Sequence, residues 1–540
     1  MIFPLLTWLI ATAWQTPPVK PAVTKPQVTK KWSPTIKVRS GLPTAKTWDE
    51  EMAAHLLRRA GFGGTPAQVQ FLAGMSREQA VEYLINFHEI PLEPIPIDVT
   101  PQWLPRGRKG EENSASLQQQ FMARQRADMQ QMQTIISWWI RMMVESPRPL
   151  QEKLVLFWHS HFTSGFREVK SSRAMYQQNQ LFRERGAGNL RDLLIAVTHD
   201  PAMIIYLNSS QNRKGKPNEN YARELMELFT MGTGHYTEVD VKEAARALTG
   251  IGIDPERGEA AFHPRQHDDG VKRILGRSGN FGADDVIDII LAQPATAEHL
   301  ARRLWSFFAY ENPDERVVRA LAQALRDSKY ELKPVLKAMF ICDAFYGDKA
   351  RFTHVKSPVE LLVGTLRMLE IAPMDTTGMN YAMRAMGQQL FQPPNVKGWD
   401  GGFSWITTST LYNRYNMICS IIEGNDNDQT RQRRTMMREA AQASLGKEAP
   451  MMLSGEEDQF QPPYDPMIVV RAEVLATDDQ IVDYFTMLLL QRPISADRRG
   501  VLLEAFHQDW KRNKARDEQK SAAIRQLLKL IVSMPEYQLG

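Results

Sequence analysis

The chain has 540 residues, of which 43% are hydrophobic and 24% are charged, the composition of an ordinary globular protein with enough chain for a large core. The formal net charge of +4 is small for this length and gives no reason to expect a nucleic-acid or membrane-surface partner. Two cysteines, Cys342 and Cys419, exclude a disulfide-stapled small scaffold, a Cys-rich zinc site and C-x-x-C-H haem attachment, and leave one disulfide open.

The first residues predict export. Residues 2–14 form an apolar run that is too short for a membrane span, and the run contains Ala11-Thr12-Ala13, the small-residue pattern that precedes signal cleavage. We therefore expect a signal peptide at 1–13 and an exported protein, in the periplasm, at the cell surface or outside the cell, with no stable membrane span. Because no Lys or Arg precedes the run, an uncleaved anchor is the alternative. Residues 14–48, rich in Pro, Thr and Lys, predict a disordered spacer.

Helical periodicity dominates from Asp49 to the C-terminus, because apolar residues recur three and four positions apart. Val271 to Leu275, which lies between two glycines, favours one small hairpin. We therefore expect an all-α fold, a large multi-helical domain over 49–540 with at most one small β-hairpin. The polar residues 425–466 predict a mobile insertion. The predicted helices lie near residues 49–60, 77–87, 116–145, 150–162, 189–198, 219–231, 238–248, 284–292, 295–308, 315–328, 332–345, 358–369, 410–422, 478–490, 496–507 and 519–533.

Two histidines lie in the segment Phe157-Trp-His-Ser-His-Phe162, which is apolar almost all round and is therefore expected to be buried. Buried imidazoles need hydrogen-bond partners. Side chains two residues apart on a helix diverge by about 200°, so His159 and His161 can share one metal only where the backbone leaves the helix, as Thr163-Ser164-Gly165 allows. Core histidines and a shared polar site both remain open.

A second segment, Asn218 to Leu228, carries two carboxylates three residues apart. Glu224 and Glu227 share one helix face with Asn220 and Arg223, so that both carboxylates can reach one point, as a metal or a shared proton requires. A solvated face with an Arg–Glu pair explains the same pattern. Thr237 with Asp240 three residues on predicts a helix start with a variant capping box.

Two loops carry further candidates. His267 and Asp268 lie in a Gly- and Pro-punctuated stretch, where side chains are free to converge on a ligand or metal, or where an Asp bonds its own backbone in a turn. After Asn395, the loop holds Trp399 and Trp405 among several glycines. These rings can stack on a sugar or another flat ligand, or they can plug the loop onto the helical core.

In combination and in this order, these segments resemble the domain of unknown function 1800 family of exported bacterial proteins, over about residues 49–540. The resemblance implies a large helical domain and carries no accepted reaction. Family members are often encoded beside a sulfatase-like exported protein, which implies such a protein as a partner. Residues 425–466 have no counterpart in the resemblance. The matching segments are His55–Gly63, Phe157–Phe162, Asn218–Leu228, Tyr236–Gly250 with His267–Lys272, Phe391–Trp399 and Ser533–Gln538.

Two classes of function follow. The working hypothesis is a hydrolytic site built from His and carboxylates, with or without a divalent metal. It predicts that His159 or His161 lies within hydrogen-bond reach of Glu224, Glu227 or Asp268, or within one water of it. The alternative is a non-catalytic cell-surface module that binds or assembles with a protein partner or a polysaccharide. No nucleophile elbow, Walker loop, dinucleotide fingerprint, H-E-x-x-H motif or flavin signature occurs. The candidate residues are His159, His161, Glu224, Glu227, Arg223 and Lys272 for catalysis, His159, His161, His267 and Asp268 for the metal, and Asn220, Asn395, Trp399 and Trp405 for binding.

Overall fold

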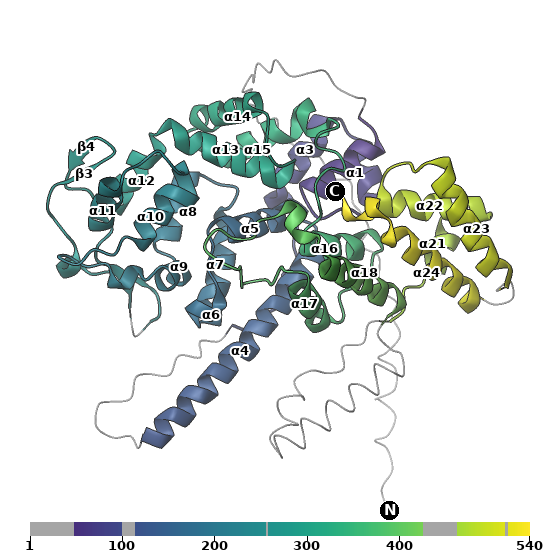
Figure 1. Ribbon diagram of the computed structural model, residues 1–540, viewed down its shortest axis with the longest axis horizontal. Coiled ribbons are helices and arrows are strands. Elements are labelled where there is room, and N and C mark those ends of the chain that lie inside the picture. The colour runs from purple at the N-terminus through teal and green to yellow at the C-terminus, as the bar shows by residue number, and fades with distance from the viewer. Residues whose placement is uncertain (1–47, 100–113, 255–256, 425–461, 513–516) are drawn as a thin grey trace, which may run out of the picture. The chain divides into compact units, whose positions relative to one another are not determined.

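The computed structural model describes residues 48–99, 114–254, 257–424, 462–512 and 517–540. The predicted signal peptide, almost all of the predicted spacer and most of the predicted insertion lie outside these residues. Within them helices dominate, which confirms the all-α fold class (Figure 1). None of the described helices is both long and apolar enough to cross a membrane. Cys342 and Cys419 are free thiols and form no disulfide with each other.

The first half of the helical body runs from α1 to α11. Most of these helices begin at Ser, Thr, Asp or Asn, whose side chain accepts the N–H of a residue in the first turn. Thr237 and Asp240 form the predicted capping box at the start of α11. The elements are α1 (Glu50–Arg59), α2 (Pro66–Ala73), α3 (Arg77–Ile85), η1 (Phe87–Glu89), α4 (Ser114–Glu145), α5 (Pro149–His161), α6 (Phe166–Val169), α7 (Ser172–Arg185), α8 (Leu190–Thr198), α9 (Pro201–Tyr206), η2 (Ser209–Gln211), α10 (Asn220–Met226), the π-helical turn η3 (Glu227–Met231) and α11 (Glu238–Ala247).

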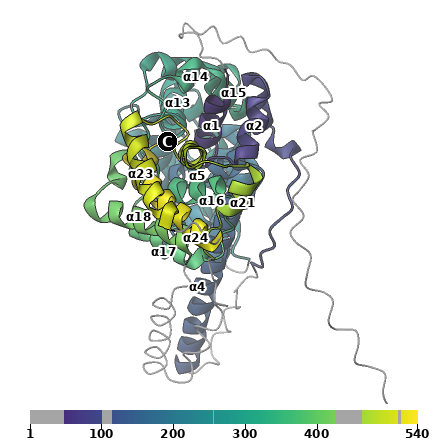
Figure 2. The ribbon, with the colours of Figure 1, turned by 90° about the vertical axis from the view of Figure 1, so that its right-hand side faces the viewer.

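The second half follows the first of two small sheets and includes four helices near the C-terminus, which face the viewer in Figure 2. Of these, α24 packs on α18, and α22 packs on α16. The elements are η4 (Pro264–Gln266), α12 (Ala283–Leu291), α13 (Pro294–Phe308), α14 (Glu315–Asp327), α15 (Leu332–Ile341), η5 (Asp343–Tyr346), α16 (Pro358–Met368), α17 (Thr376–Ala385), η6 (Gly402–Trp405), α18 (Thr408–Glu423), α21 (Met467–Ala472), α22 (Asp478–Leu490), α23 (Ala496–Arg512), α24 (Asp517–Ser533) and η8 (Pro535–Gln538).

Two antiparallel strand pairs interrupt the helices. β3 (Lys272–Ile274) and β4 (Arg277–Gly279) form the predicted hairpin, and its two turn residues, Leu275 and Gly276, both have positive φ, as the tight turns of twisted hairpins require. β1 (Ile251–Ile253) pairs with β2 (Ala260–Phe262) and was not predicted. Strands of three residues are too short to show an alternating pattern in the sequence.

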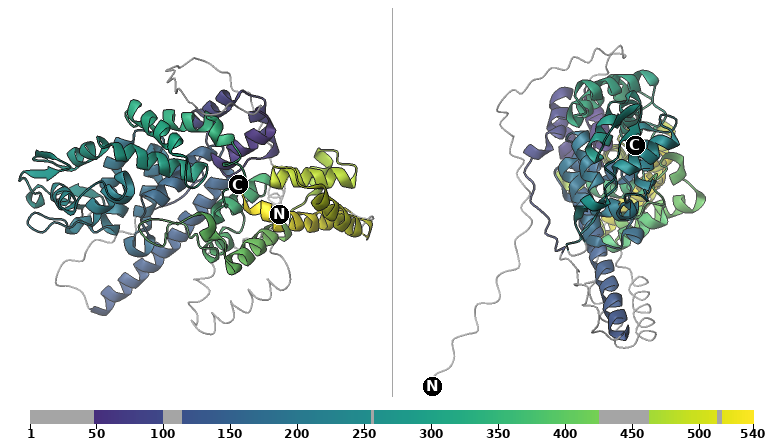
Figure 3. Two further views of the ribbon diagram at one scale, coloured as in Figure 1. Left: turned by 45° about the horizontal axis from the view of Figure 1, so that its top comes forward. Right: turned by 90° about the vertical axis from the view of Figure 1, so that its left-hand side faces the viewer.

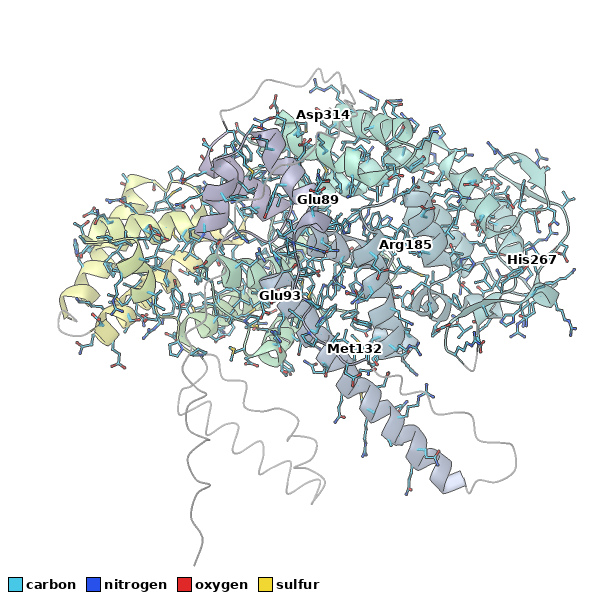
Figure 4. The ribbon with its side chains drawn as sticks, turned by 180° about the vertical axis from the view of Figure 1, so that it is seen from behind. Glu89, Glu93, Met132, Arg185, His267 and Asp314 are labelled. Atoms are coloured by element: carbon cyan, nitrogen blue, oxygen red, sulfur yellow. The ribbon has the colours of Figure 1, made fainter. Side chains whose placement is uncertain are left out.

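Two helices, α5 and α16, are buried along almost their whole length and lie near the middle of the helical body (Figure 1). By contrast, α4 enters the core only from Met132 onward, and its first half projects beyond the other helices (Figures 3 and 4). At the start of α16, the Ser357 hydroxyl accepts the N–H of Glu360, and the Glu360 carboxylate accepts the N–H of Ser357. This capping box holds the Glu360 carboxylate in the interior.

Candidate functional site

His159 is buried near the end of α5 and is bound by a backbone group. Its Nε2 accepts the N–H of Phe391 at 3.1 Å, so Nδ1 carries the proton of the neutral ring. The ring lies against Trp139 and Trp399, with centroids 5.5 and 5.6 Å away. Burial lowers the pKa of His159 to about 3, so it is uncharged at pH 7. His159 therefore ties α5 to the loop that begins at Phe391.

His161 points to a different set of elements. Its Nε2–H donates to the carbonyl of Phe229 at 3.0 Å, and His299 donates to the neighbouring carbonyl of Leu228 at 3.1 Å. Both carbonyls belong to η3, where the π-helical turn interrupts the α-helical ladder of hydrogen bonds. Burial, and then the charge of Arg303, holds the pKa of His161 well below its usual range. The rings of His161 and His299 therefore supply hydrogen-bond donors to two carbonyls of η3, directly after α10.

These contacts bear on the predicted metal site. The side chains of Glu224, Glu227 and Asp268 are not among the hydrogen-bond partners of His159 and His161, whose Nε2 atoms bind backbone groups. No three His, Cys, Asp or Glu side chains lie close enough to hold a metal anywhere in the described part of the chain. The four residues predicted as metal ligands are therefore not brought together.

Glu224 and Glu227 do share one half-buried face, as predicted. The Tyr236 hydroxyl donates to Glu227 at 2.5 Å. Burial, and then the neighbouring charge of Glu227, raises the pKa of Glu224. Arg223 makes two hydrogen bonds of 2.7 Å to Glu238 on α11 and one of 3.3 Å to Glu219. Asn220 is exposed at the start of α10.

The predicted loop residues His267, Asp268 and Lys272 hold their own loop together. His267 Nδ1–H donates to the carbonyl of Thr249 at 2.9 Å, and Figure 4 shows His267 near the edge of the molecule. Asp268 accepts from Arg246 at 2.9 Å and from the N–H of Gly270, and the bond to Arg246 lowers the pKa of Asp268 to about 2. Lys272 is buried and donates to the side chain of Asn280 and the carbonyl of Phe281, both at 2.9 Å.

Trp399 and Trp405 plug their loop onto the core and are not free to stack on a ligand. They are 9% and 6% exposed and pack together with Val355. The Asn395 side chain is exposed and accepts the N–H of Lys397, which closes a turn. At Gly398 the backbone has a φ of +84°, and a Cβ atom would lie 2.3 Å from the Ser160 carbonyl, so glycine is required where the loop meets α5.

The exposed rings of this region are ones that the sequence analysis did not select. Phe403, Tyr412 and Tyr381 are 80%, 68% and 73% exposed, although they are aromatic. They come from η6, α18 and α17, and α17 packs on α18, where Asn413 donates to the carbonyl of Ala385 at 3.2 Å. On α18 the available signal was the run of large side chains in its first two turns, Leu411, Tyr412 and Tyr415. We call this set the aromatic surface: Tyr381, Phe403, Leu411, Tyr412 and Tyr415.

A buried charged centre was also missed. The Glu360 carboxylate accepts from Lys153 at 2.5 Å and from His354 at 3.1 Å, and Arg59 lies 3.7 Å away. Lys153 is fully buried on α5, and the ion pair with Glu360 links α5 to α16. The available signals were a lysine directly before the apolar run Leu154 to Trp158 of α5 and the paired arginines of the family-like segment on α1.

A family model described as "Protein of unknown function (DUF1800)" matches residues 55–539, which is nearly the whole chain. This match confirms the resemblance predicted from the order of the sequence segments. No curated protein and no solved structure matches the chain.

Proposed function

The chain belongs to the family described as Protein of unknown function (DUF1800), and we propose that it is an exported, non-catalytic module that binds a partner protein. The observation that carries the proposal is the aromatic surface on α17, η6 and α18. Large aromatic side chains are exposed to water on each of these three elements, which is costly unless another molecule covers them. The surface replaces the Trp399 and Trp405 pair in the binding hypothesis.

The composition of the aromatic surface favours a protein over other ligands. Its members are tyrosines, a phenylalanine and a leucine, and Met374, just before α17, is also exposed. The centres of protein interfaces are enriched in Tyr, Phe and Met and poor in charge, with polar residues at the rim. Arg384, exposed on α17, is a suitable rim residue. The partner that we propose is the sulfatase-like exported protein that the family resemblance implies.

The binding experiment uses the purified protein and the sulfatase-like protein encoded nearby. Titration calorimetry should give a complex that Phe403→Ser combined with Tyr412→Ser weakens about 10- to 100-fold, because aromatic side chains at an interface centre carry much of the affinity. Val501→Ser is the matched control, since Val501 is an exposed apolar residue on α23, outside the aromatic surface. Equal affinity in both variants contradicts the proposal, and so does binding to a purified polysaccharide in place of the protein.

Export is tested separately. N-terminal sequencing of the protein recovered outside the cytoplasm should find a chain that starts near Trp14, because Ala11-Thr12-Ala13 fits signal cleavage. A chain that retains Met1 contradicts cleavage at this site.

A second candidate is a hydrolytic acid–base site at Glu224 and Glu227. It is favoured by one observation. The half-buried Glu224 has a raised pKa and lies beside Glu227, which accepts a hydrogen bond from Tyr236. Chromogenic ester, sulfate and glycoside substrates would test it. Glu224→Gln should abolish any hydrolysis found, whereas Glu219→Gln, on the same surface, should not. Equal rates in the two variants contradict this candidate.

A further inference from the structure

Three carboxylates are buried in the described part of the chain, and their surroundings differ. Glu152 pairs with Arg183, and Glu360 pairs with Lys153. Asp200 is 2% exposed and forms no ion pair with any described residue. An ionised carboxylate without a counter-charge is costly in the interior, and binding a proton removes that cost. Among these three acids, Asp200 is therefore the one that burial favours in its protonated form.

The hydrogen-bond partners of Asp200 are neutral donors. The amide Nε2 of Gln178 donates to Oδ2 of Asp200 at 2.7 Å, and the N–H of Met203 donates to the same oxygen at 2.9 Å. The hydroxyl of Ser164 donates to Oε1 of Gln178 at 2.5 Å, so the amide nitrogen of Gln178 faces Asp200. Because both bonds to Asp200 end on Oδ2, the proton of the acid form belongs on Oδ1.

The elements around Asp200 bring no cation within ion-pair distance, as far as the chain is described. Asp200 is the N-cap of α9, which packs on α6, α7, α8, η2 and β1 (Figure 1). The charge of Asp200 acts on Tyr221 of α10, whose pKa is raised mainly by burial. The other ionisable groups of these elements are exposed or contact other residues: Arg167 and Glu168 on α6, Arg173, Tyr176, Arg183, Glu184 and Arg185 on α7, Arg191, Asp192 and His199 on or directly after α8, and Tyr206 on α9.

The titration of Asp200 agrees with this geometry. Burial raises the pKa of Asp200 to about 7 from its ordinary 3.8, although hydrogen bonds from Met203 and Gln178 act in the opposite direction. Between these two values the folded protein binds one more proton than the unfolded chain. The stabilisation from this proton is complete below pH 3.8 and is lost as the pH rises through about 7. The buried histidines, whose pKa values are lowered, have the opposite effect.

The short helix α9 is the element that depends most directly on Asp200. It has six residues, and Ile205 and Tyr206 near its end are half-buried. A helix of this length is not stable alone, so α9 is held by its cap and by packing. Gln178 on α7 and Asp200 are both buried, so water reaches an ionised Asp200 only when α9 moves away from α7.

We propose that Asp200 is a proton-dependent switch that holds α9 against α7 when it is protonated and loosens α9 when it ionises. The hydrogen bonds of the switch run from Ser164, just after α5, through Gln178 to the cap of α9. The chain continues from α9 through η2 to α10, so loosening reaches the segment that leads to Glu224. The switch uses no residue of the aromatic surface and does not depend on a partner protein.

The first experiment compares Asp200→Asn with the wild-type protein. Asparagine keeps the shape, still caps a helix and cannot ionise. The Tm of the variant minus that of the wild type should be about 2 °C or more higher at pH 8 than at pH 5, because only the wild type buries a charge at pH 8. This difference excludes the buried histidines, which both proteins share.

The control is Asp192→Asn, an exposed position on α8, whose Tm difference from the wild type should be the same at both pH values. Asp200→Ser, which also provides a neutral cap, serves the same purpose if Asp200→Asn does not fold. A Tm difference for Asp200→Asn that does not change between pH 5 and pH 8 overturns the proposal.

Hydrogen exchange then tests the movement of α9. After correction for the intrinsic exchange rate, the amides of α9 in the wild type should lose protection about 10-fold between pH 6 and pH 8, because each pH unit above the pKa changes the proton occupancy 10-fold. Asp200→Asn should keep this protection. Constant protection of α9 in the wild type overturns the role of α9, and an equal loss in the variant overturns the assignment to Asp200.

Discussion

The two buried polar centres of this molecule meet the cost of burial in opposite ways. At the end of α5, His159 and His161 are neutral, and each ring uses a nitrogen on a backbone group. Around α16, Lys153 and Arg59 interact through charge with Glu360. The first centre is closed by hydrogen bonds alone, whereas the second needs counter-charges.

The difference follows from the chemistry of the side chains. An imidazole loses its proton near neutral pH, so a buried histidine needs only one or two hydrogen-bond partners. A guanidinium group stays charged, so a buried arginine needs an anion as well. Buried histidines are therefore a weak sign of a catalytic site.

The largest expected effect is that of Glu360→Gln, which removes the carboxylate and keeps its shape. Lys153 and Arg59 then stay buried beside a neutral amide, and breaking a buried ion pair costs about 3–5 kcal/mol. Urea unfolding followed by circular dichroism measures the loss. Glu145→Gln is the control, because its exposed pair with Arg141 contributes under about 1 kcal/mol. Similar losses in both variants would break the comparison.

Acid should affect the histidine centre first. The folded-state pKa of His159 is about 3 against an ordinary 6.5, so the folded protein binds fewer protons than the unfolded chain between these values. Stability therefore falls as the pH falls, by about 2–3 kcal/mol between pH 6.5 and 4.5 for this residue. Glu360, whose pKa is depressed, is fully stabilising above its ordinary pKa of 4.5 and loses its contribution only at lower pH.

The variant His159→Leu separates the pH range in which His159 acts from the lower range in which Glu360 acts. The variant should reduce the loss of stability above pH 4.5 by the contribution of His159 and leave the rest, because His161, whose pKa is also depressed, and Glu360 are unchanged. Urea midpoints across the pH range measure both. A wild-type protein whose stability is constant from pH 6.5 to 4.5 contradicts the assignment of His159 as a buried neutral base.

The smallest effect is expected for His161→Leu. The carbonyl of Phe229 loses its donor, and an unsatisfied buried carbonyl costs about 1–2 kcal/mol. His235→Leu is the control, since His235 is exposed and its replacement should change stability by less than about 0.5 kcal/mol. If the two variants have the same free energy of unfolding in urea, the hydrogen bond from His161 to η3 contributes nothing to stability. The hydrogen bonds at the end of α5 would then not stabilise the histidine centre.

Most of the helices could be predicted from the sequence because their buried faces are apolar. The predicted helix at 478–490 matches α22, and the predicted one at 315–328 matches α14 to within one residue. The helix α7 was missed because its buried face carries polar side chains: Gln178 donates to Asp200 at 2.7 Å, and Arg183 donates to Glu152 at 2.8 Å. A face built from paired polar residues leaves no apolar period to read.

The burial of the two candidate histidines could be predicted from the sequence, but their hydrogen-bond partners could not. The apolar residues around His159 and His161 correctly indicated an interior position. Their partners are backbone groups, and side-chain patterns do not show where a π-helical turn presents its carbonyls. Arg59, in the last turn of a helix, has the sequence pattern of a solvated basic residue, and its burial depends on Glu360, about 300 positions away.

The position of α1 has a consequence for how the protein is made. His55 donates to the carbonyl of Phe345, Arg59 to that of Phe308, and Arg58 to Gln491. This first helix therefore leaves the ribosome long before the residues that hold it have been synthesised. Contacts of such sequence separation form slowly, and nascent chains fold as units only when the unit is complete. A chain stalled before α13 lacks all three partners and should leave α1 undocked and open to proteases, and protection should increase as Phe308, Phe345 and finally Gln491 emerge.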